Sequence, residues 1–493
     1  MTAWTLLLAI LACTPSPPEA GGKGRSARQG QGARPAKASK KAGKRPGAKA
    51  RGQKQRIIRG SGYPEPSARP ALTTLDDLDA NQPGLVLLVI MDTLRSDRTH
   101  VCGHDKPNTP VLDAMTKNLG YSISCAATTP ASWTLPSHAS FFTGAPTSEH
   151  GVHTHGTALG DDFETLAEIY AERGYQTAFL SANPVFSKAA GGFWQGFDTV
   201  VSVKGLSNPL RDDTFNDHIG RLLDRQSNRK PLFLVVNIFD AHDPYPAVPG
   251  GLDWATPADE LDLHPHTADA DNPYFRFVTG AMPEEEQGPY VDTVRNAYDH
   301  AVFVADRNLG KLMKQLEKRN LMAKGARVLI TSDHGEHLGE HGLLRHGSHT
   351  WETVTRVPLL YKDSTATAPI TLPERMSATT VFDLIRDGAL PKAPRLVEAA
   401  TAHNKEDFKP SANAVSLWPS AWTKLTWEDG TYSVLDLTTD PGELNPSSMP
   451  SDHPLRATLD ARIKEHEASI LEALGRGADP DVMEMLQEVG YVQ

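Results

Sequence analysis

The sequence predicts an α/β protein with a large, mostly parallel sheet sandwiched by helices and a smaller C-terminal α+β subdomain. Three observations favour this fold class. Short continuous apolar runs recur along the chain, helical patterns separate them, and polar residues follow each run where it ends. Because a strand that is apolar on both faces must be covered on both, such runs are typical of parallel sheets.

Four apolar runs have the length and composition of buried strands. They are Leu85–Met91, Gln176–Leu180, Leu232–Phe239 and Val328–Thr331. Helical patterns lie between them, at Phe163–Arg173 and Val294–Asn320. We expect Asp161 or Asp162 to cap the first of these helices and Gly174 to end it.

After Pro358 the α/β pattern weakens. Val415–Asp440 alternates apolar and polar residues as antiparallel strands do, and Thr431–Leu437 fits one arm of a hairpin. Asp481–Val489 has the pattern of a short amphipathic helix at the C-terminus. The expected boundaries are 81–363 for the α/β domain and 364–493 for the smaller subdomain with its terminal helix.

The N-terminus resembles an export signal. Residues 1–13 read MTAWTLLLAILAC, an apolar run shorter than the ~20 residues that span a membrane. The run ends as a bacterial lipobox does, so Cys13 is a candidate lipid anchor; a plain secretion signal, or neither, are the alternatives. Residues 14–80 read as a disordered basic linker. We therefore expect a protein anchored to a bacterial membrane, facing the periplasm or cell surface, or a secreted one.

The net charge of −10 hides an asymmetry between this linker and the rest of the chain. Residues 21–59 hold 14 of the 50 Lys and Arg residues and no Asp or Glu, which leaves 36 basic and 60 acidic residues elsewhere. An acidic body is a poor nucleic-acid binder, so no nucleic-acid partner is expected. The basic segment could contact anionic lipids, but its composition favours a solvated tether.

Each predicted strand leads directly into residue types that carry chemistry. The four clusters are Asp92, Ser181-Ala182-Asn183, Asp240-Ala241-His242 and Asp333-His334. Since ligands of open α/β sheets bind beyond the carboxyl ends of the strands, these clusters point to one site.

A metal ion is the simplest species that these clusters could bind together. Asp333 and His334 can offer an oxygen and a nitrogen to one ion, and Asp92 can add a second carboxylate. A capping Asp and surface histidines are the alternative, and we expect His337 and His341 to lie in solvent or around the ligands. Calcium, magnesium, manganese and zinc all remain open as the one divalent cation.

The segment Ser132–Ser140 supplies several hydroxyls next to the helix-like run Ala139–Thr143. A hydroxyl at a helix N-terminus lies in a positive field, and a metal would activate it as a nucleophile. Taken alone, capping by Ser or Thr is the simpler interpretation.

Together these segments resemble the sulfatase family of the alkaline-phosphatase superfamily, from about Gly84 to Asn445. The matching segments are Asp92–Asp97, Thr134–Ser140 with Thr143-Gly144, His242–Tyr245, Ser332–Glu336, Glu340–Gly342, Arg356–Pro358 and Asp436–Asn445. The resemblance implies an alkaline-phosphatase-like fold and a catalytic domain at 81–363. It also implies that Asp92, Thr134, Asp333 and His334 bind the metal.

The departures from the family pattern concern the nucleophile, one metal ligand and the substrate contacts. Thr134 stands where sulfatases carry the cysteine that becomes formylglycine, and Thr93 where many carry a further metal-binding Asp. A threonine nucleophile resembles the phosphatase, phosphodiesterase and phosphoethanolamine-transferase relatives. His138 replaces an arginine, Asn183 lies in a segment that normally contacts sulfate, and His346 or His349 replaces a lysine.

We therefore expect a metal-dependent hydrolase of sulfate or phosphate esters. Thr134, His242 and His346 are the expected catalytic residues, and His138, Asn183 and His349 are expected to bind substrate. One alternative is a phosphoethanolamine-type transferase or a two-metal phosphodiesterase, the latter with Asp240, His242 and His346 around the second ion. Another is a surface binding protein without catalysis. Cys102 and Cys125 could pair in an oxidising compartment, which their spacing leaves open.

Overall fold

The computed structural model describes residues 56–57, 73–153, 157–181, 183–186, 191–202, 212–245, 272–401 and 413–475. Cys13 and the predicted helix Asp481–Val489 lie outside these residues. Two parts of the predicted linker 14–80 have regular structure: Arg56–Ile57 forms β1, and Leu75–Asp77 forms the 3-10 helix η2.

The described residues form a large sheet in the order β1-β5-β4-β6-β2-β7-β10-β3-β11. Its other strands are β2 (Leu85–Met91), β3 (Ser122–Thr128), β4 (Gln176–Ser181), β5 (Thr199–Ser202), β6 (Leu232–Ile238), β7 (Ala326–Thr331), β10 (Arg356–Asp363) and β11 (Arg375–Ser377). The strands β5, β4, β6, β2 and β7 pair in parallel, and β11 is parallel to β3. The strand β10 is antiparallel to both neighbours. The predicted, mostly parallel sheet is confirmed.

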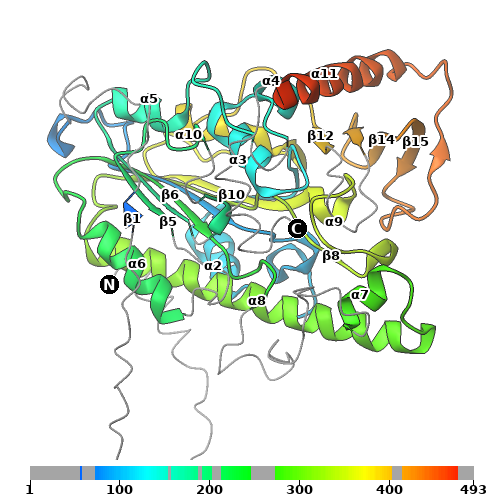
Figure 1. Ribbon diagram of the computed structural model, residues 1–493. Coiled ribbons are helices and arrows are strands. Elements are labelled where there is room, and N and C mark those ends of the chain that lie inside the picture. The colour runs from blue at the N-terminus through cyan, green and yellow to red at the C-terminus, as the bar shows by residue number, and fades with distance from the viewer. Residues whose placement is uncertain are drawn as a thin grey trace, which may run out of the picture. The chain divides into compact units, whose positions relative to one another are not determined.

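Helices cover both faces of this sheet (Figure 1). One layer holds α3 (Thr134–Thr143), α5 (Leu166–Glu172) and α10 (Val381–Asp387); the other holds α2 (Pro110–Leu119), α6 (Asp212–Leu223) and α8 (Glu284–Lys318). Val86, Leu88 and Ile90 of β2 share a core with Phe141 and Leu384 of the first layer. Every residue of β2 is buried, so both faces of this central strand are covered, as its continuous apolar run predicts.

Helix boundaries differ from the predicted ones for local reasons. The helix α8 begins at Glu284, ten residues before the predicted start at Val294. The prediction missed these first turns because they bury no side chain and therefore show no apolar pattern. The helix α5 is capped by Thr165, whose hydroxyl accepts from the backbone of Glu168 while the Glu168 carboxylate accepts from Thr165. This capping box replaces the expected caps Asp161 and Asp162.

The large sheet also continues past residue 363, the predicted end of the α/β domain. The strand β11 pairs with β3, and Val381, Leu384 and Ile385 of α10 pack into the main core. That boundary therefore falls too early. Pro358 makes β10 itself hard to recognise, because proline is rare inside a central strand; a register shift between Val357 and Leu359 accommodates it.

The C-terminal part forms an antiparallel sheet of β12 (Glu398–Thr401), β13 (Ala414–Leu417), β14 (Thr423–Glu428), β15 (Thr431–Asp436) and β16 (Ser447–Ser448). Leu459 and Ile463 of α11 (Arg456–Gly475) pack on it. The smaller α+β subdomain is confirmed. Short elements complete the described chain: η3 (Ser96–Arg98), η4 (His100–Cys102), α4 (Thr147–His150), η5 (Pro184–Phe186), α7 (Pro273–Val278), β8 (His337–Leu338), η7 (Glu340–Gly342), β9 (Leu344–Arg345), α9 (Glu352–Thr355) and η8 (Ala378–Thr380).

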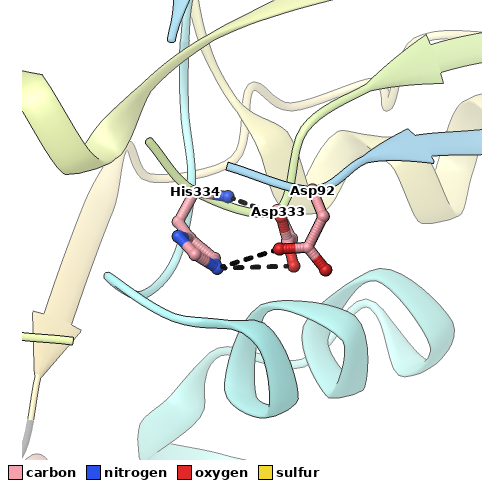
Figure 2. A group of neighbouring side chains, drawn as sticks. All are labelled: Asp92, Asp333 and His334. Atoms are coloured by element: carbon pink, nitrogen blue, oxygen red, sulfur yellow. Dashed lines mark hydrogen bonds and ion pairs between the residues drawn. The ribbon is translucent and has the colours of Figure 1, made fainter. Parts of the chain in front are cut away.

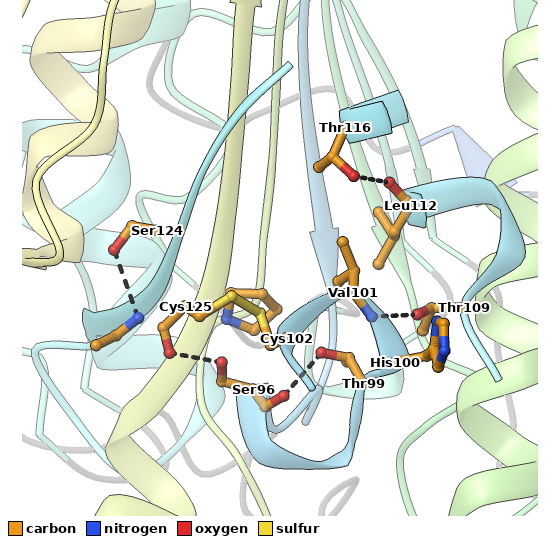
Figure 3. Close-up of a disulfide and its surroundings, with 12 residues drawn as sticks. Ser96, Thr99, His100, Val101, Cys102, Thr109, Leu112, Thr116, Ser124 and Cys125 are labelled. Atoms are coloured by element: carbon orange, nitrogen blue, oxygen red, sulfur yellow. Dashed lines mark hydrogen bonds between the residues drawn. A yellow bond between two sulfur atoms is a disulfide. The ribbon is translucent and has the colours of Figure 1, made fainter. Parts of the chain in front are cut away.

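A disulfide joins Cys102 of η4 to Cys125 of β3 (Figure 3). The hydroxyl of Ser96 donates to the carbonyl of Cys125 at 2.6 Å. The disulfide and this hydrogen bond tie the segment after β2 to β3, from which β7 and β10 separate β2 in the sheet. Within the described ranges, no helix is both long and apolar enough to cross a bilayer.

Candidate metal and catalytic site

Four parallel strands bring the predicted site residues to one edge of the sheet. Asp92 directly follows β2, and Asp333 and His334 follow β7. Asn183 follows β4, and Asn237 is the last residue but one of β6. Because these strands are consecutive in the sheet and run in the same direction, the five side chains meet beyond their carboxyl ends.

Asp92, Asp333 and His334 form a compact buried group (Figure 2). One ligand atom from each lies within 4.8 Å of the other two. The His334 Nε2 atom is 3.7 Å from Asp92 Oδ1 and 3.6 Å from Asp333 Oδ2. His334 Nδ1 donates to the carbonyl of Gly335 at 2.9 Å, so Nε2 carries the lone pair that faces the carboxylates.

The donor set fits one divalent cation. Asp92 Oδ1 and Asp333 Oδ2 are buried with no hydrogen-bond partner. Burial raises the pKa of each carboxyl group to about 7, and for Asp92 the charge of Asp333 adds to the shift. Two buried carboxylates facing an imidazole lone pair are costly without a cation. Two oxygens and one nitrogen suit calcium, magnesium, manganese or zinc.

The second oxygen of each carboxylate is held by hydrogen bonds. Asp92 Oδ2 accepts from the side-chain amides of Asn183 and Asn237, both at 3.0 Å. Asp333 Oδ1 accepts from the backbone N–H groups of Thr93 at 3.3 Å and His334 at 3.0 Å. Thr93 has a φ of 60°, which is strained for a β-branched residue. In this backbone conformation the N–H of Thr93 points toward Asp333.

Thr134 lies beside the buried group. It is the first residue of α3, five residues before the predicted helical run, so its hydroxyl sits at the helix N-terminus. Thr134 Oγ1 is 3.3 Å from His334 Nε2 and accepts from Asn183 Nδ2 at 3.3 Å. The hydroxyls of Ser132 and Ser137 donate elsewhere, to Thr401 and to the Ala131 carbonyl.

Of the two histidines predicted to be catalytic, His346 lies next to this group and His242 lies next to His346. The ring of His346 is 4.3 Å from that of His334, and its Nδ1 is 3.1 Å from a Glu336 carboxylate oxygen. The ring of His242 is 4.7 Å from that of His346. His349 instead hydrogen-bonds Glu428 of β14 at 2.9 Å. Of the two candidates for the lysine position, His346 is the one beside the metal ligands.

His138 and Asn183, which are expected to bind substrate, are buried and hydrogen-bonded to residues of the site. His138 packs against Phe142 and Phe186, and its Nδ1 donates to the Thr134 carbonyl at 2.9 Å. Burial lowers its pKa to about 3, so the ring is neutral and supports the first turn of α3. Asn183 bridges the Asp92 carboxylate and the Thr134 hydroxyl.

Two residues of the site, Asn237 and Arg95, were not predicted from the sequence. Asn237 is the lone amide in the apolar run of β6, a signal that could have identified it. Buried Arg95 donates to the Glu336 carbonyl at 2.9 Å and so holds the segment after His334. The same guanidinium group pairs with Asp97 at 2.7 Å. Asp240, a candidate ligand of a second ion, accepts from Asn308 at 2.9 Å. Among the described residues, Asp92, Asp333 and His334 form the one cluster of His, Cys, Asp or Glu side chains with metal-binding geometry.

A sulfatase family model matches residues 85–386. The chain belongs to the sulfatase family. This span covers all four strand ends that carry the metal group and its partners. Sulfatases are metal-dependent, and Asp92, Asp333 and His334 are the described residues that could hold the ion.

Individual relatives are distant. The chain is 23% identical over 341 residues to an ulvan-active sulfatase of Formosa agariphila, covering 62% of this chain and 63% of that protein. An uncharacterised sulfatase of Escherichia coli is 25% identical over 323 residues, covering 56% and 62%. The chain thus spans less than two thirds of either relative. A phosphonate monoester hydrolase of Agrobacterium radiobacter shares the fold, with a TM-score of 0.56 at 17% identity over 80% of this chain and 96% of that one.

Proposed function

We propose that this protein is a metal-dependent hydrolase of sulfate or phosphate esters that uses Thr134 as its nucleophile. The observation that carries the proposal is the position of the Thr134 hydroxyl, 3.3 Å from the Nε2 atom of His334 in the buried group. Membership of the sulfatase family supports ester hydrolysis. The proposal includes both sulfate and phosphate esters as substrates, because a phosphonate monoester hydrolase has the same fold.

In the proposed reaction, the Thr134 hydroxyl releases its proton to solvent, Oγ1 attacks the sulfur or phosphorus atom, and the bond to the leaving alcohol breaks. A divalent cation held by Asp92, Asp333 and His334, with Thr134 as a further ligand, would lower the pKa of the hydroxyl and neutralise charge on the ester oxygens. Asn183 holds the Thr134 hydroxyl against Asp92. His242 or His346 donates the proton that the leaving alcohol needs. Water then hydrolyses the ester on Thr134.

The test is a parallel activity screen with nitrophenyl sulfate, phosphate monoester, phosphodiester and phosphonate monoester. Thr134→Ala should lower turnover of the preferred substrate by about 10³-fold or more, as loss of a nucleophile does. Ser137→Ala is the matched control, since it removes a buried hydroxyl of the same helix that bonds the Ala131 carbonyl. Elemental analysis should find about one metal ion per chain in both variants.

Full activity of the Thr134→Ala variant would refute the nucleophile. Two ions per chain would favour the two-metal phosphodiesterase, and release of product only when an acceptor alcohol is present would favour a transferase. Bound metal without turnover of any ester would favour the binding protein.

We also propose that the protein is exported and anchored through Cys13. The disulfide between Cys102 and Cys125 supports export, because such bonds persist in oxidising compartments. Cys13→Ala should move the protein from the membrane fraction to the soluble fraction. An unchanged distribution would contradict the anchor.

A further inference from the structure

A buried ion pair lies in the C-terminal subdomain. Lys424 of β14 is fully buried, and its Nζ atom is 2.6 Å from Glu443 Oε1. The same ammonium group donates to the Thr350 carbonyl at 2.6 Å. Charged side chains are almost never fully buried unless they are paired, so both groups depend on this arrangement.

Glu443 belongs to Asp436–Asn445, the C-terminal segment that matches the family pattern and that the proposed mechanism does not use. The Asp440 carboxylate accepts from the backbone N–H groups of Leu444 at 3.0 Å and Asn445 at 2.7 Å, which fixes the turn. Glu443 has a φ of 56°, a strained conformation for a residue with a side chain. Its second carboxylate oxygen, Oε2, accepts from the Glu352 N–H at 2.6 Å.

Lys424 and Glu443 therefore hold the backbone at two points, the Thr350 carbonyl and the Glu352 N–H. We call this pair the clamp. The backbone that it holds continues directly into α9. The Glu352 carboxylate pairs with Arg375 of β11 at 2.7 Å, so this stretch is also fixed to the large sheet.

The two residues that follow Glu352, Thr353 and Val354, contact the segment that carries the metal ligands. The Thr353 carbonyl accepts from the Glu336 N–H at 3.0 Å, and the Val354 carbonyl accepts from the Gly335 N–H at 2.9 Å. At Gly335 a Cβ atom would lie 2.1 Å from the Thr353 carbonyl oxygen, so the two strands of backbone approach closely. Gly335 directly follows His334, and its carbonyl accepts from the ring of that residue.

We propose that Lys424 and Glu443 are positioning residues for the metal site, acting through residues 350–354 on Gly335 and Glu336. A stabilising role alone does not require an ion pair, because apolar residues of the same volume often stabilise a buried position as well or better. The directional hydrogen bonds of the clamp instead fix the backbone that orients Asp333 and His334. This inference rests on the proposed metal-dependent function.

The test measures affinity for Mn²⁺ as the probe ion in the full chain, by electron paramagnetic resonance of the free ion. Lys424→Met and Glu443→Gln should each weaken binding about tenfold, at the low end of the range for changes around metal ligands. The double variant should be little worse than either single one, because both residues act as one unit. Circular dichroism at the same temperature checks that each variant is folded.

Leu459→Ala is the matched control. Leu459 packs in the core of the same subdomain, so its truncation lowers stability without touching the clamp. Its Mn²⁺ affinity should equal that of the wild type. Wild-type affinity in both clamp variants, or an equal loss in Leu459→Ala, would overturn the proposal. If Lys424→Met does not fold, Glu443→Gln decides alone, since it keeps an oxygen to accept from Glu352. A wild-type chain that binds no Mn²⁺ would overturn the metal-dependent function as well.

Discussion

Replacing Asp92 with Asn should stabilise the metal-free protein at pH 8. Burial raises the pKa of the Asp92 carboxyl group from 3.8 to about 7. The unfolded chain releases this proton near pH 4, whereas the folded chain holds it until about pH 7. The stability of the metal-free protein therefore falls as pH rises between these values. Three pKa units correspond to about 4 kcal/mol of lost stability above pH 7.

The Asn side chain avoids this cost while keeping the hydrogen bonds of the other oxygen. Its carbonyl oxygen can accept from Asn183 and Asn237, as Asp92 Oδ2 does. Its amide nitrogen takes the place of Oδ1, which is buried without a partner, at a cost of about 1–3 kcal/mol. The metal-free variant should thus be more stable than wild type by about 1–3 kcal/mol at pH 8, and less stable by a similar amount at pH 4.

Urea unfolding at pH 4 and pH 8, with chelator present, measures both differences. Adding Mn²⁺ at pH 8 should reverse the order, because the variant lacks one ligand. Asp460→Asn, which removes an exposed carboxylate of α11, is the control and should show no gain at pH 8. A metal-free Asp92→Asn protein that is equally destabilised at both pH values would refute the reasoning.

Two further predictions concern stability. The disulfide joins cysteines that are 23 residues apart in the sequence, and replacing both with Ala opens the loop between them. The free energy of unfolding in urea titrations should fall by about 3 kcal/mol, and an unchanged midpoint would contradict this. Burial lowers the pKa of His466 from 6.5 to about 4, so the stability from its neutral form is present above pH 6.5 and lost as pH falls toward 4. His466→Phe should remove about 3 kcal/mol of that acid-induced loss, measured by circular dichroism against pH, and an equal loss in both proteins would argue against it.

The sequence predicted the central strands well because both of their faces are apolar. The bounds of β2 match the predicted run Leu85–Met91, and β6 ends one residue earlier than predicted. The strand β10 escaped recognition because Pro358 normally argues against a central strand. The strand β11 has three residues, too few to show a pattern.

The metal group was predictable because its members directly follow strands. The hydrogen bonds around it were not. The Asn237 amide reaches Asp92 only after β6 and β2 pair, and the contribution of Thr93 comes from its backbone rather than its side chain. The choice between His346 and His349 depends on which one the C-terminal sheet engages, and that contact with Glu428 spans 79 residues.

The antiparallel strand β10 lies between the strand that leads to the metal ligands and the strand that leads to the nucleophile. It pairs with β7 on one side and with β3 on the other, and the Thr129 N–H extends the second pairing to the Thr355 carbonyl. A slip of one residue along β10 would shift Thr134 by about 3.3 Å relative to Asp333, far enough to separate hydroxyl and cation. Relatives that lengthen or shorten this strand could therefore lose catalysis while retaining every reactive side chain.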